Sequence, residues 1–465
     1  MQYSARPETP RVLLRCVAAT AAVAVALAVL PARALPRPVP ASAPASLGAL
    51  DVIALEICYT TVMARYYKPV DPAVLLAGAR RGLTAYLTSR GVAPARLPAI
   101  PAHVDRYRAE SEIDREVALA VARYGTRVRT HDLVAQTIAG EIAALRDPYS
   151  VVFPPAAFKT FVGFLDGKAS AGIGAELDVD PTMHAVRIVD VFPDGPAEGA
   201  GLRAGDTITA IDERPAATSA EVGRALRGRP GTTVRIAFTR DGVPQPQLVL
   251  VRAVIVAPDV TARVIGEGLG YVRIRSFGAR SPQQLDLLLA RLRRAGTRGY
   301  VVDLRADGGG YRDAAIAIAS HFVRGIVVTT RERTGPPVPF AAKETTALLG
   351  GPLAVLVDGD TASAAEIVAA AIQDAKAGTL VGARTFGKGL VQETFALPDG
   401  GAIKLTTARY LTPAGRDIDA IGIEPDVAVA QPPGAHPGEL GHDAQLDRAV
   451  AILTLQLPAN HGGDL

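Results

Sequence analysis

The chain has 465 residues, enough for two to four domains of ordinary size. Hydrophobic residues make up 49% of it and charged residues 21%, a composition that is typical of globular proteins and excludes an intrinsically disordered one. The formal net charge of +4 is small for this length and the basic residues are scattered, so the sequence shows no cluster of Lys and Arg of the kind that binds nucleic acid.

Residues 1–34 have the pattern of a targeting segment. Three arginines come first, an apolar run covers residues 17–30, and Ala32-Arg33-Ala34 fits a small-residue cleavage site. The apolar run is short for a membrane span, which favours a cleaved signal peptide over an uncleaved anchor formed by residues 12–34. A Pro/Ala linker follows over residues 35–48. We therefore expect an extracytoplasmic protein, in the periplasm or cell envelope, that is secreted or N-terminally anchored.

Residues 49–168 predict a helical N-terminal region. Apolar residues recur at spacings of three and four over residues 50–67, and Asp71 followed by Pro72 marks the start of a second helix. Two further helices are expected over residues 113–124 and 132–145, with a Pro-rich polar loop over residues 91–108. Cys58 lies in the first helix, and without a nearby His or Asn it is expected to be a small buried residue.

Short strands and glycine turns replace the helices over residues 169–256. Gly172-Ile173-Gly174 opens this region, and Thr218 with Glu221 forms a capping box for a short helix. The pattern resembles a PDZ domain. The resemblance implies that backbone N–H groups of residues 172–174 bind a peptide carboxylate while the peptide adds a strand to the sheet edge. An ordinary tight turn is the alternative for these glycines.

Strands and helices alternate over residues 257–430, which predicts an α/β domain. An apolar strand over residues 353–357 precedes Ser363, and an Ala-rich helix follows it. A serine at this turn would present its hydroxyl beside free backbone N–H groups, which suits a nucleophile whose transition state is an oxyanion. Alternatively, Ser363 is a second capping residue beside Asp360 and Thr361.

Lys388 is the second candidate for chemistry. Gly387 and Gly389 flank it, and apolar side chains lie close by in the sequence. A lysine among apolar groups loses hydration, so we expect its pKa to fall. A lysine that is neutral near physiological pH can act as the general base for a serine.

The two segments together resemble a known family. The sequence Thr-Ala-Ser-Ala-Ala-Glu-Ile at residues 361–367, followed by Phe-Gly-Lys-Gly-x-Val-Gln at residues 386–392, resembles the carboxyl-terminal processing (tail-specific) proteases, which are S41-type serine peptidases with a PDZ domain. The resemblance covers roughly residues 49–429. It implies an α/β protease core of the ClpP/crotonase-like type over residues 257–430, in which Ser363 and Lys388 form a catalytic dyad.

Further site residues follow from the resemblance alone. The backbone amide of Ala364 and that of Gly309 or Gly310 would form the oxyanion hole. The family often has Asn-Pro before a Gly pair, where this chain has Ala306, Asp307 and a third glycine. The alternative for the glycine run is a plain strand-to-helix turn.

Gln392 would orient Lys388 in this family. In a straight strand the two side chains would stand about 13 Å apart, so the chain must bend near Gly389 for this role. Otherwise Gln392 is a solvated strand residue. The family signature Asp-Pro-Tyr-Ser at residues 147–150 is expected to form a structural turn.

The sequence thus predicts a serine endopeptidase that cleaves extracytoplasmic proteins near their C-terminus after its PDZ domain has bound an apolar C-terminal tail. The resemblance leaves open a homodimer formed through the N- and C-terminal helices, the latter within residues 431–465. No cofactor is expected, and the seven histidines lack a metal-ligand spacing. His321 in an apolar run is expected to be a core or edge residue. The alternative function is a peptide-binding PDZ scaffold with a latent or inactive core.

Overall fold

The computed structural model describes residues 47–457, apart from residues 94–98, 101–102, 167–169, 181–184, 193, 204, 216–218, 267, 344–350, 433–434 and 436. The expected leader, most of the linker and Thr218 lie outside the described residues. The chain divides into two compact units. The first comprises Met1–Val162, Val328–Phe340 and Lys388–Ala420, and the second comprises Gly163–Val327, Ala341–Gly387 and Ile421–Leu465.

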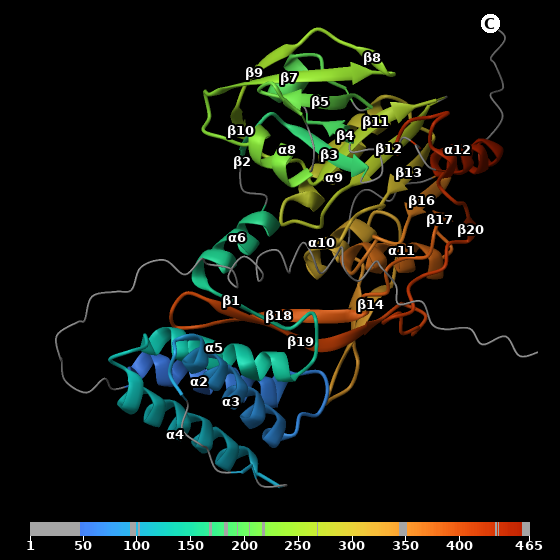
Figure 1. Cartoon of the computed structure of the whole chain (residues 1–465). Helices are drawn as coiled ribbons and strands as arrows, with labels where there is room; N and C mark the ends of the chain where they lie inside the picture. Colours follow the sequence, from blue (N-terminus) through green and yellow to red (C-terminus); the bar gives the residue numbers. More distant parts are fainter. Residues whose placement is uncertain are drawn as a thin grey trace, which may run out of the picture. The chain divides into compact units, whose positions relative to one another are not determined.

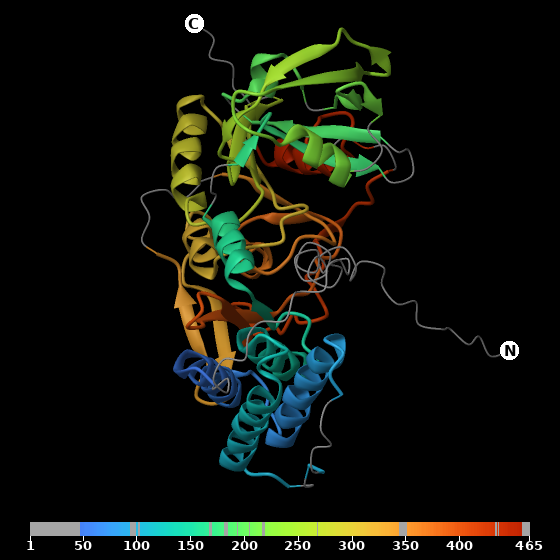
Figure 2. The same cartoon turned by 60° about the vertical axis from the view of Figure 1, so that its left-hand side comes forward.

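The first unit combines a helix bundle with a small antiparallel sheet. Its helices are α2 (Ala49–Arg65), α3 (Pro72–Ser89), α4 (Arg106–Tyr124) and α5 (Thr130–Ala144), which form one bundle in Figures 1 and 2. Its sheet has the order β1 (Val151–Phe153), β19 (Ala402–Leu411), β14 (Ile326–Glu332) and β15 (Val338–Ala341), and β18 (Leu390–Ala396) also pairs with β19. Leu397, Ile403 and Leu405 belong to the same hydrophobic core as the helices.

The start of α4 differs from the prediction. The expected loop over residues 91–108 ends early, because Asp105 caps the helix by accepting hydrogen bonds from the backbone N–H groups of Tyr107 and Arg108. The first turns of this helix are polar, so they lack the apolar spacing on which the prediction depended. The start of α3 is as predicted, since Asp71 accepts a hydrogen bond from Ala73 N and Pro72 is the first helical residue.

A buried carboxyl group lies in the bundle core. Glu141 on α5 has no solvent-exposed surface, and it lies beside Cys58 of α2. Burial raises the pKa of Glu141 well above its usual value, with Asp114 and Glu110 adding to the effect. Cys58 is itself fully buried, as the sequence predicted.

The second unit begins with the predicted PDZ domain. Its main sheet has the order β3 (Ala175–Asp180), β4 (Ala185–Val191), β5 (Thr207–Ile211), β7 (Thr233–Arg240) and β8 (Val243–Pro244), with β6 (Arg214–Pro215) beside β5 and β9 (Leu248–Val251) beside β7. Two short helices, α7 (Pro196–Gly199) and α8 (Ser219–Leu226), complete the domain, and β2 (Ser170–Gly172) pairs with β10 (Ala253–Ile255). Alternate residues of β4 and β7, namely Val186, Ile188, Val234 and Ile236, are fully buried.

The predicted α/β core in the second unit is built on a six-stranded sheet. Its order is β11 (Val260–Ile265), β12 (Leu269–Ile274), β13 (Gly299–Asp303), β16 (Leu353–Val357), β17 (Thr379–Gly382) and β20 (Val427–Ala428), and every pairing after β11 and β12 is parallel. The helices of this part are α9 (Ser281–Arg294), α10 (Arg312–Ala319), α11 (Ala364–Asp374) and α12 (Ala444–Gln456), and α6 (Pro155–Leu165) leads from the first unit to the second. Since parallel strands end at the same sheet edge, the segments after β13 and β16 meet there.

A buried ion pair fixes α12 to the sheet. Arg305, directly after β13, donates hydrogen bonds to the carboxylates of Asp303 and Asp443. Asp443 is also the N-cap of α12, where its side chain accepts a hydrogen bond from Leu446 N. The helix buries Leu446, Ala449 and Leu453 in the same hydrophobic cluster as residues of β13, β16 and β17. Of the helices in the described part of the chain, none has the length and apolar character needed to cross a membrane.

Candidate active site

Ser363 lies where β16 gives way to α11, in an unusual backbone conformation. It is the N-cap residue of α11, with φ 58° and ψ −115°. A non-glycine residue rarely adopts a positive φ, and such strain costs about 1–3 kcal/mol and is concentrated at functional sites. The turn is held in place by the Thr361 hydroxyl, which donates to the carbonyl oxygen of Leu304 at the end of the neighbouring strand. The surrounding structure therefore imposes the conformation of Ser363.

Glu366 holds the serine turn from within. Its fully buried carboxylate accepts hydrogen bonds from Ser363 N at 2.8 Å, Thr385 Oγ1 at 2.6 Å and Gly387 N at 2.8 Å. One side chain thus fixes both the turn that carries Ser363 and the segment that leads to Lys388. The sequence analysis did not assign Glu366 a role, although Ser-x-x-Glu is the pattern of a capping box and could have revealed its bond to Ser363 N.

The glycine run after β13 packs directly on the serine turn. A Cβ atom at Gly309 would lie 2.8 Å from Ala362 O, Ala364 N and Ser363 Cβ, so only glycine allows this approach. Gly309 also has φ 96°, which favours glycine. Its N–H group donates to Asp307 Oδ1 at 2.7 Å, whereas Gly310 is exposed. The structure therefore brings Gly309 and Ala364 together, as the sequence analysis expected.

Lys388 begins the last segment of the first unit and is half-buried. Its Nζ lies 5.0 Å from the ring centroid of Tyr149, and its carbonyl oxygen accepts a hydrogen bond from the Tyr410 hydroxyl. The sequence analysis expected residues 147–150 to form only a turn. That turn is present, since Ser150 Oγ donates to Asp147 Oδ2 at 2.6 Å, but the contact of Tyr149 with the lysine was missed.

A second lysine, Lys404 on β19, shares the electrostatic environment of Lys388. Its Nζ faces the rings of Phe153 and Phe161, at 5.8 and 5.3 Å from their centroids. Burial, aided by the charge of Lys388 and opposed by that of Asp147, lowers the pKa of Lys404 to about 8. The first unit therefore places two lysines close enough for their charges to interact.

The segment between Lys388 and Gln392 is irregular. The pairing of β18 with β19 shifts its register between Val391 and Gln392, which is a β-bulge two residues beyond the bend expected near Gly389. The side-chain amide of Gln392 donates to Leu390 O at 3.2 Å and to Thr406 Oγ1 at 3.5 Å. Ser363 and the glycine run belong to the second unit, and Lys388 and Gln392 belong to the first.

The expected peptide-binding loop lies beside an open sheet edge. Gly174 has φ 77°, and its carbonyl oxygen accepts a hydrogen bond from Phe192 N, while that of Ile173 accepts one from Ala197 N. The following strand, β3, is at the edge of the main PDZ sheet and is paired with β4 alone in the described part of the domain. An extended peptide could therefore add to β3 next to the loop of residues 172–174.

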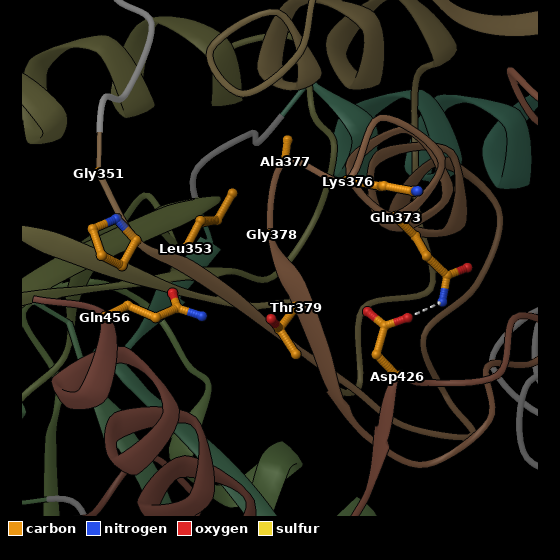
Figure 3. A pocket seen from close by; sticks show the side chains of 10 residues that line it. Gly351, Leu353, Gln373, Lys376, Ala377, Gly378, Thr379, Asp426 and Gln456 are labelled. Carbon is orange, nitrogen blue, oxygen red and sulfur yellow. Dashed lines mark hydrogen bonds between the residues drawn. The ribbon is translucent and has the colours of Figure 1, made fainter.

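A polar pocket lies elsewhere on the core (Figure 3). It is lined by residues at the start of β16 and β17 and at the ends of α11 and α12, and a hydrogen bond joins Gln373 to Asp426 on one side of it. Leu353 lines the pocket, whereas Ser363 follows the opposite end of the same strand. The pocket is therefore separate from the serine turn.

Comparisons with known proteins agree with this architecture. Residues 171–249 match the PDZ domain family and residues 268–429 match Peptidase family S41. A carboxyl-terminal-processing protease of Picosynechococcus sp. is 35% identical over 337 residues, which cover 70% of this chain and 80% of that protein. A carboxy-terminal-processing protease of Bartonella bacilliformis is 35% identical over 332 residues, which cover 67% and 75% of the two chains.

A solved structure supports the fold. The putative S41 protease from Bacteroides fragilis has a TM-score of 0.56 and 16% sequence identity to this chain, and the match covers 85% of this chain and 96% of the other. The sequence relatives and the matches to the PDZ and S41 families identify the chain as a member of the carboxyl-terminal-processing proteases, a group of serine endopeptidases in peptidase family S41.

Proposed function

We propose that the enzyme cleaves extracytoplasmic proteins near their C-terminus, with Ser363 as the nucleophile and Lys388 as its general base. The observation that carries this proposal is the strained conformation of Ser363 at the N-terminus of α11, with Gly309 packed against Ala364 N. Backbone N–H groups at a helix start stabilise developing negative charge. The proposal requires the two units to bring Lys388 Nζ within hydrogen-bonding distance of Ser363 Oγ.

Each chemical step assigns the proton to a named group. Ser363 Oγ attacks the peptide carbonyl carbon as neutral Lys388 Nζ accepts the hydroxyl proton. The N–H groups of Ala364 and Gly310 then stabilise the oxyanion, because the N–H group of Gly309 is engaged by Asp307. Lys388 returns the proton to the leaving amine, an acyl-enzyme forms, and water activated by neutral Lys388 releases the product. Gln392 orients Lys388 in this scheme.

The PDZ domain selects the substrate in this proposal. The loop of residues 172–174 binds the terminal carboxylate through its backbone N–H groups, and the tail adds a strand to β3. The open edge of β3 beside this loop supports the assignment. The pattern of residues 1–34 supports an extracytoplasmic location. A membrane anchor there and a homodimer through terminal helices stay predictions, to be measured by fractionation of cells and by sedimentation.

The test is cleavage of an unfolded protein that bears an apolar C-terminal tail. The chain from Leu35 onward is compared with its Ser363→Ala and Lys388→Ala variants, and Lys376→Ala, outside the proposed site, serves as the matched lysine control. We expect cleavage by the parent and the control alone, weakened when the tail is made charged. We also expect the turnover rate to rise with pH as Lys388 loses its proton.

Two results would contradict the proposal. Equal cleavage by the parent, the Ser363→Ala variant and the Lys388→Ala variant would show that the nucleophile lies elsewhere. A flat turnover rate from neutral to alkaline pH would show that no lysine must lose its proton. If neither the parent nor any variant cleaves the protein while all of them bind its tail, the chain acts as a peptide-binding scaffold under these conditions.

A further inference from the structure

We propose that Asp307 acts as a neutral carboxylic acid that positions the oxyanion-binding backbone, and that its ionisation inactivates the enzyme. The inference deepens the proposed function, because it assumes that Ser363 is the nucleophile. Asp307 is a positioning residue here, acting through the backbone groups of its neighbours and not on the substrate itself.

Asp307 is bonded to both sides of the proposed oxyanion hole. Its Oδ1 accepts the hydrogen bond from Gly309 N at 2.7 Å, and its carbonyl oxygen accepts one from Ala362 N at 2.9 Å. Ala362 immediately precedes Ser363, and Gly309 packs against Ala364 N. Through these two bonds, Asp307 sets the position of the glycine run relative to the serine turn.

The surroundings of Asp307 disfavour a negative charge. The side chain is fully buried, and its Oδ2 has no hydrogen-bond partner among the described residues. The charged groups that face it are Asp259 before β11, Asp358 after β16 and Arg273 on β12. Burial is the main cause that raises the pKa of Asp307 well above its usual value; the hydrogen bond from Gly309 N and the charge of Arg273 oppose the shift, and the two neighbouring carboxyl groups add to it.

The neutral form suits the chemistry of the site. A protonated carboxyl group still offers Oδ1 as an acceptor to Gly309 N, so the glycine run keeps its place. A carboxylate at the same position would put a negative charge one residue from the glycines, next to the oxyanion that forms on the substrate's carbonyl oxygen when Ser363 attacks. In a buried site this repulsion is weakly screened, and it would oppose the transition state.

The experiment compares Asp307→Asn with the parent enzyme. Asparagine has the same shape, stays neutral at every pH and can accept the hydrogen bond from Gly309 N through its amide oxygen. Asp313→Asn is the matched control, because Asp313 lies six residues further along with a largely exposed side chain. The turnover rate is measured from about pH 6 to about pH 10. Over the same range, infrared difference spectra between the parent and Asp307→Asn follow the band of the protonated Asp307 carboxyl group.

We expect Asp307→Asn to keep the turnover rate within about threefold at neutral pH, and the difference spectrum to show a protonated carboxyl in the parent. Wherever that band disappears at alkaline pH, parent activity should fall relative to that of Asp307→Asn by about tenfold per pH unit. Where the band persists, the two profiles should rise together. The Asp313→Asn control should follow the parent throughout.

Several outcomes would overturn the inference. These are a loss of more than about tenfold in Asp307→Asn at neutral pH, the absence of the band at neutral pH, or a loss of the band without a loss of activity. If Asp307→Asn does not fold, Asp307→Ser supplies the neutral reference for the spectra, and band and activity are compared in the parent. Cleavage that survives in Ser363→Ala would instead refute the proposed function. The infrared spectra would still show whether Asp307 is protonated, because they do not depend on activity.

Discussion

Replacing Gly309 with alanine should disable the enzyme through one methyl group. The new Cβ would lie 2.8 Å from three atoms of the serine turn, and reaching 3.4 Å, an ordinary contact, requires a shift of about 0.6 Å. Overpacking costs about 1–3 kcal/mol and a positive φ costs alanine about 1–2 kcal/mol, so the free energy of unfolding should fall by about 2–5 kcal/mol. A displacement of this size beside the proposed oxyanion donors, Ala364 and Gly310, should lower the turnover rate by about 100-fold.

Gly308→Ala is the matched control for this prediction. A Cβ at Gly308 would have no heavy atom within 4 Å, so the same substitution one residue earlier should be tolerated. The assay combines steady-state cleavage of the tailed, unfolded protein with urea unfolding of each variant. A Gly309→Ala enzyme with parental turnover, or equal losses in both variants, would refute the packing of this glycine on the serine turn.

Three further predictions concern buried ionisable groups. Glu366→Gln cannot accept all three hydrogen bonds, so the free energy of unfolding should fall by about 1–3 kcal/mol and turnover should fall with it. In the parent, the raised pKa of Glu141 should make stability decrease as pH rises above about 4.5, by at most about 1.4 kcal/mol per pH unit, and Glu141→Gln should remove this dependence. The pKa of Lys404 is lowered to about 8, so stability should rise between pH 8 and 10.5, by up to about 3 kcal/mol, and Lys404→Met should abolish the rise.

Urea unfolding across pH checks all three, with turnover measured as well for Glu366→Gln. The exposed Glu424 supplies the control Glu424→Gln, which should change the free energy of unfolding by less than about 0.5 kcal/mol. A Glu366→Gln variant as stable as this control would mean that the three bonds contribute nothing. Parallel pH profiles for the parent and either Glu141→Gln or Lys404→Met would mean that the group titrates alike in the folded and unfolded chain.

Local sequence signals predicted the strand-turn-helix around Ser363. An apolar run of five residues and an Ala-rich stretch with a capping pattern are short-range features, and they place the serine at the start of α11. The flanking glycines and nearby apolar residues singled out Lys388, and the family resemblance added Gln392 and the oxyanion role of the glycine run. Their catalytic roles stay predictions, because no reacting group has been tested.

The remaining site features depend on contacts between distant segments. Nothing near Asp307 in the sequence shows that its carboxyl group is buried. The neighbouring carboxyl groups come from distant segments, Asp259 before β11 and Asp358 after β16. The contact of Tyr149 with Lys388 likewise joins two segments far apart in the chain. The polar start of α4 was missed for a local reason, since its amphipathic pattern begins only after the first turn.

The attachment of α12 has a consequence for self-digestion. An enzyme that cleaves near protein C-termini, as proposed here, also meets the C-terminal segments of neighbouring copies. Removing residues after Gln456 would leave every contact of the Asp443 cap in place, but a cut before Asp443 would leave the buried Arg305 without one of its two carboxylate partners. Arg305 would keep Asp303 as a partner, but the cut would also remove Leu446, Ala449 and Leu453 from the core cluster on the sheet, so it should destabilise the unit that carries Ser363. Trimming by a neighbouring copy should thus become inactivating once it passes α12 and reaches Asp443.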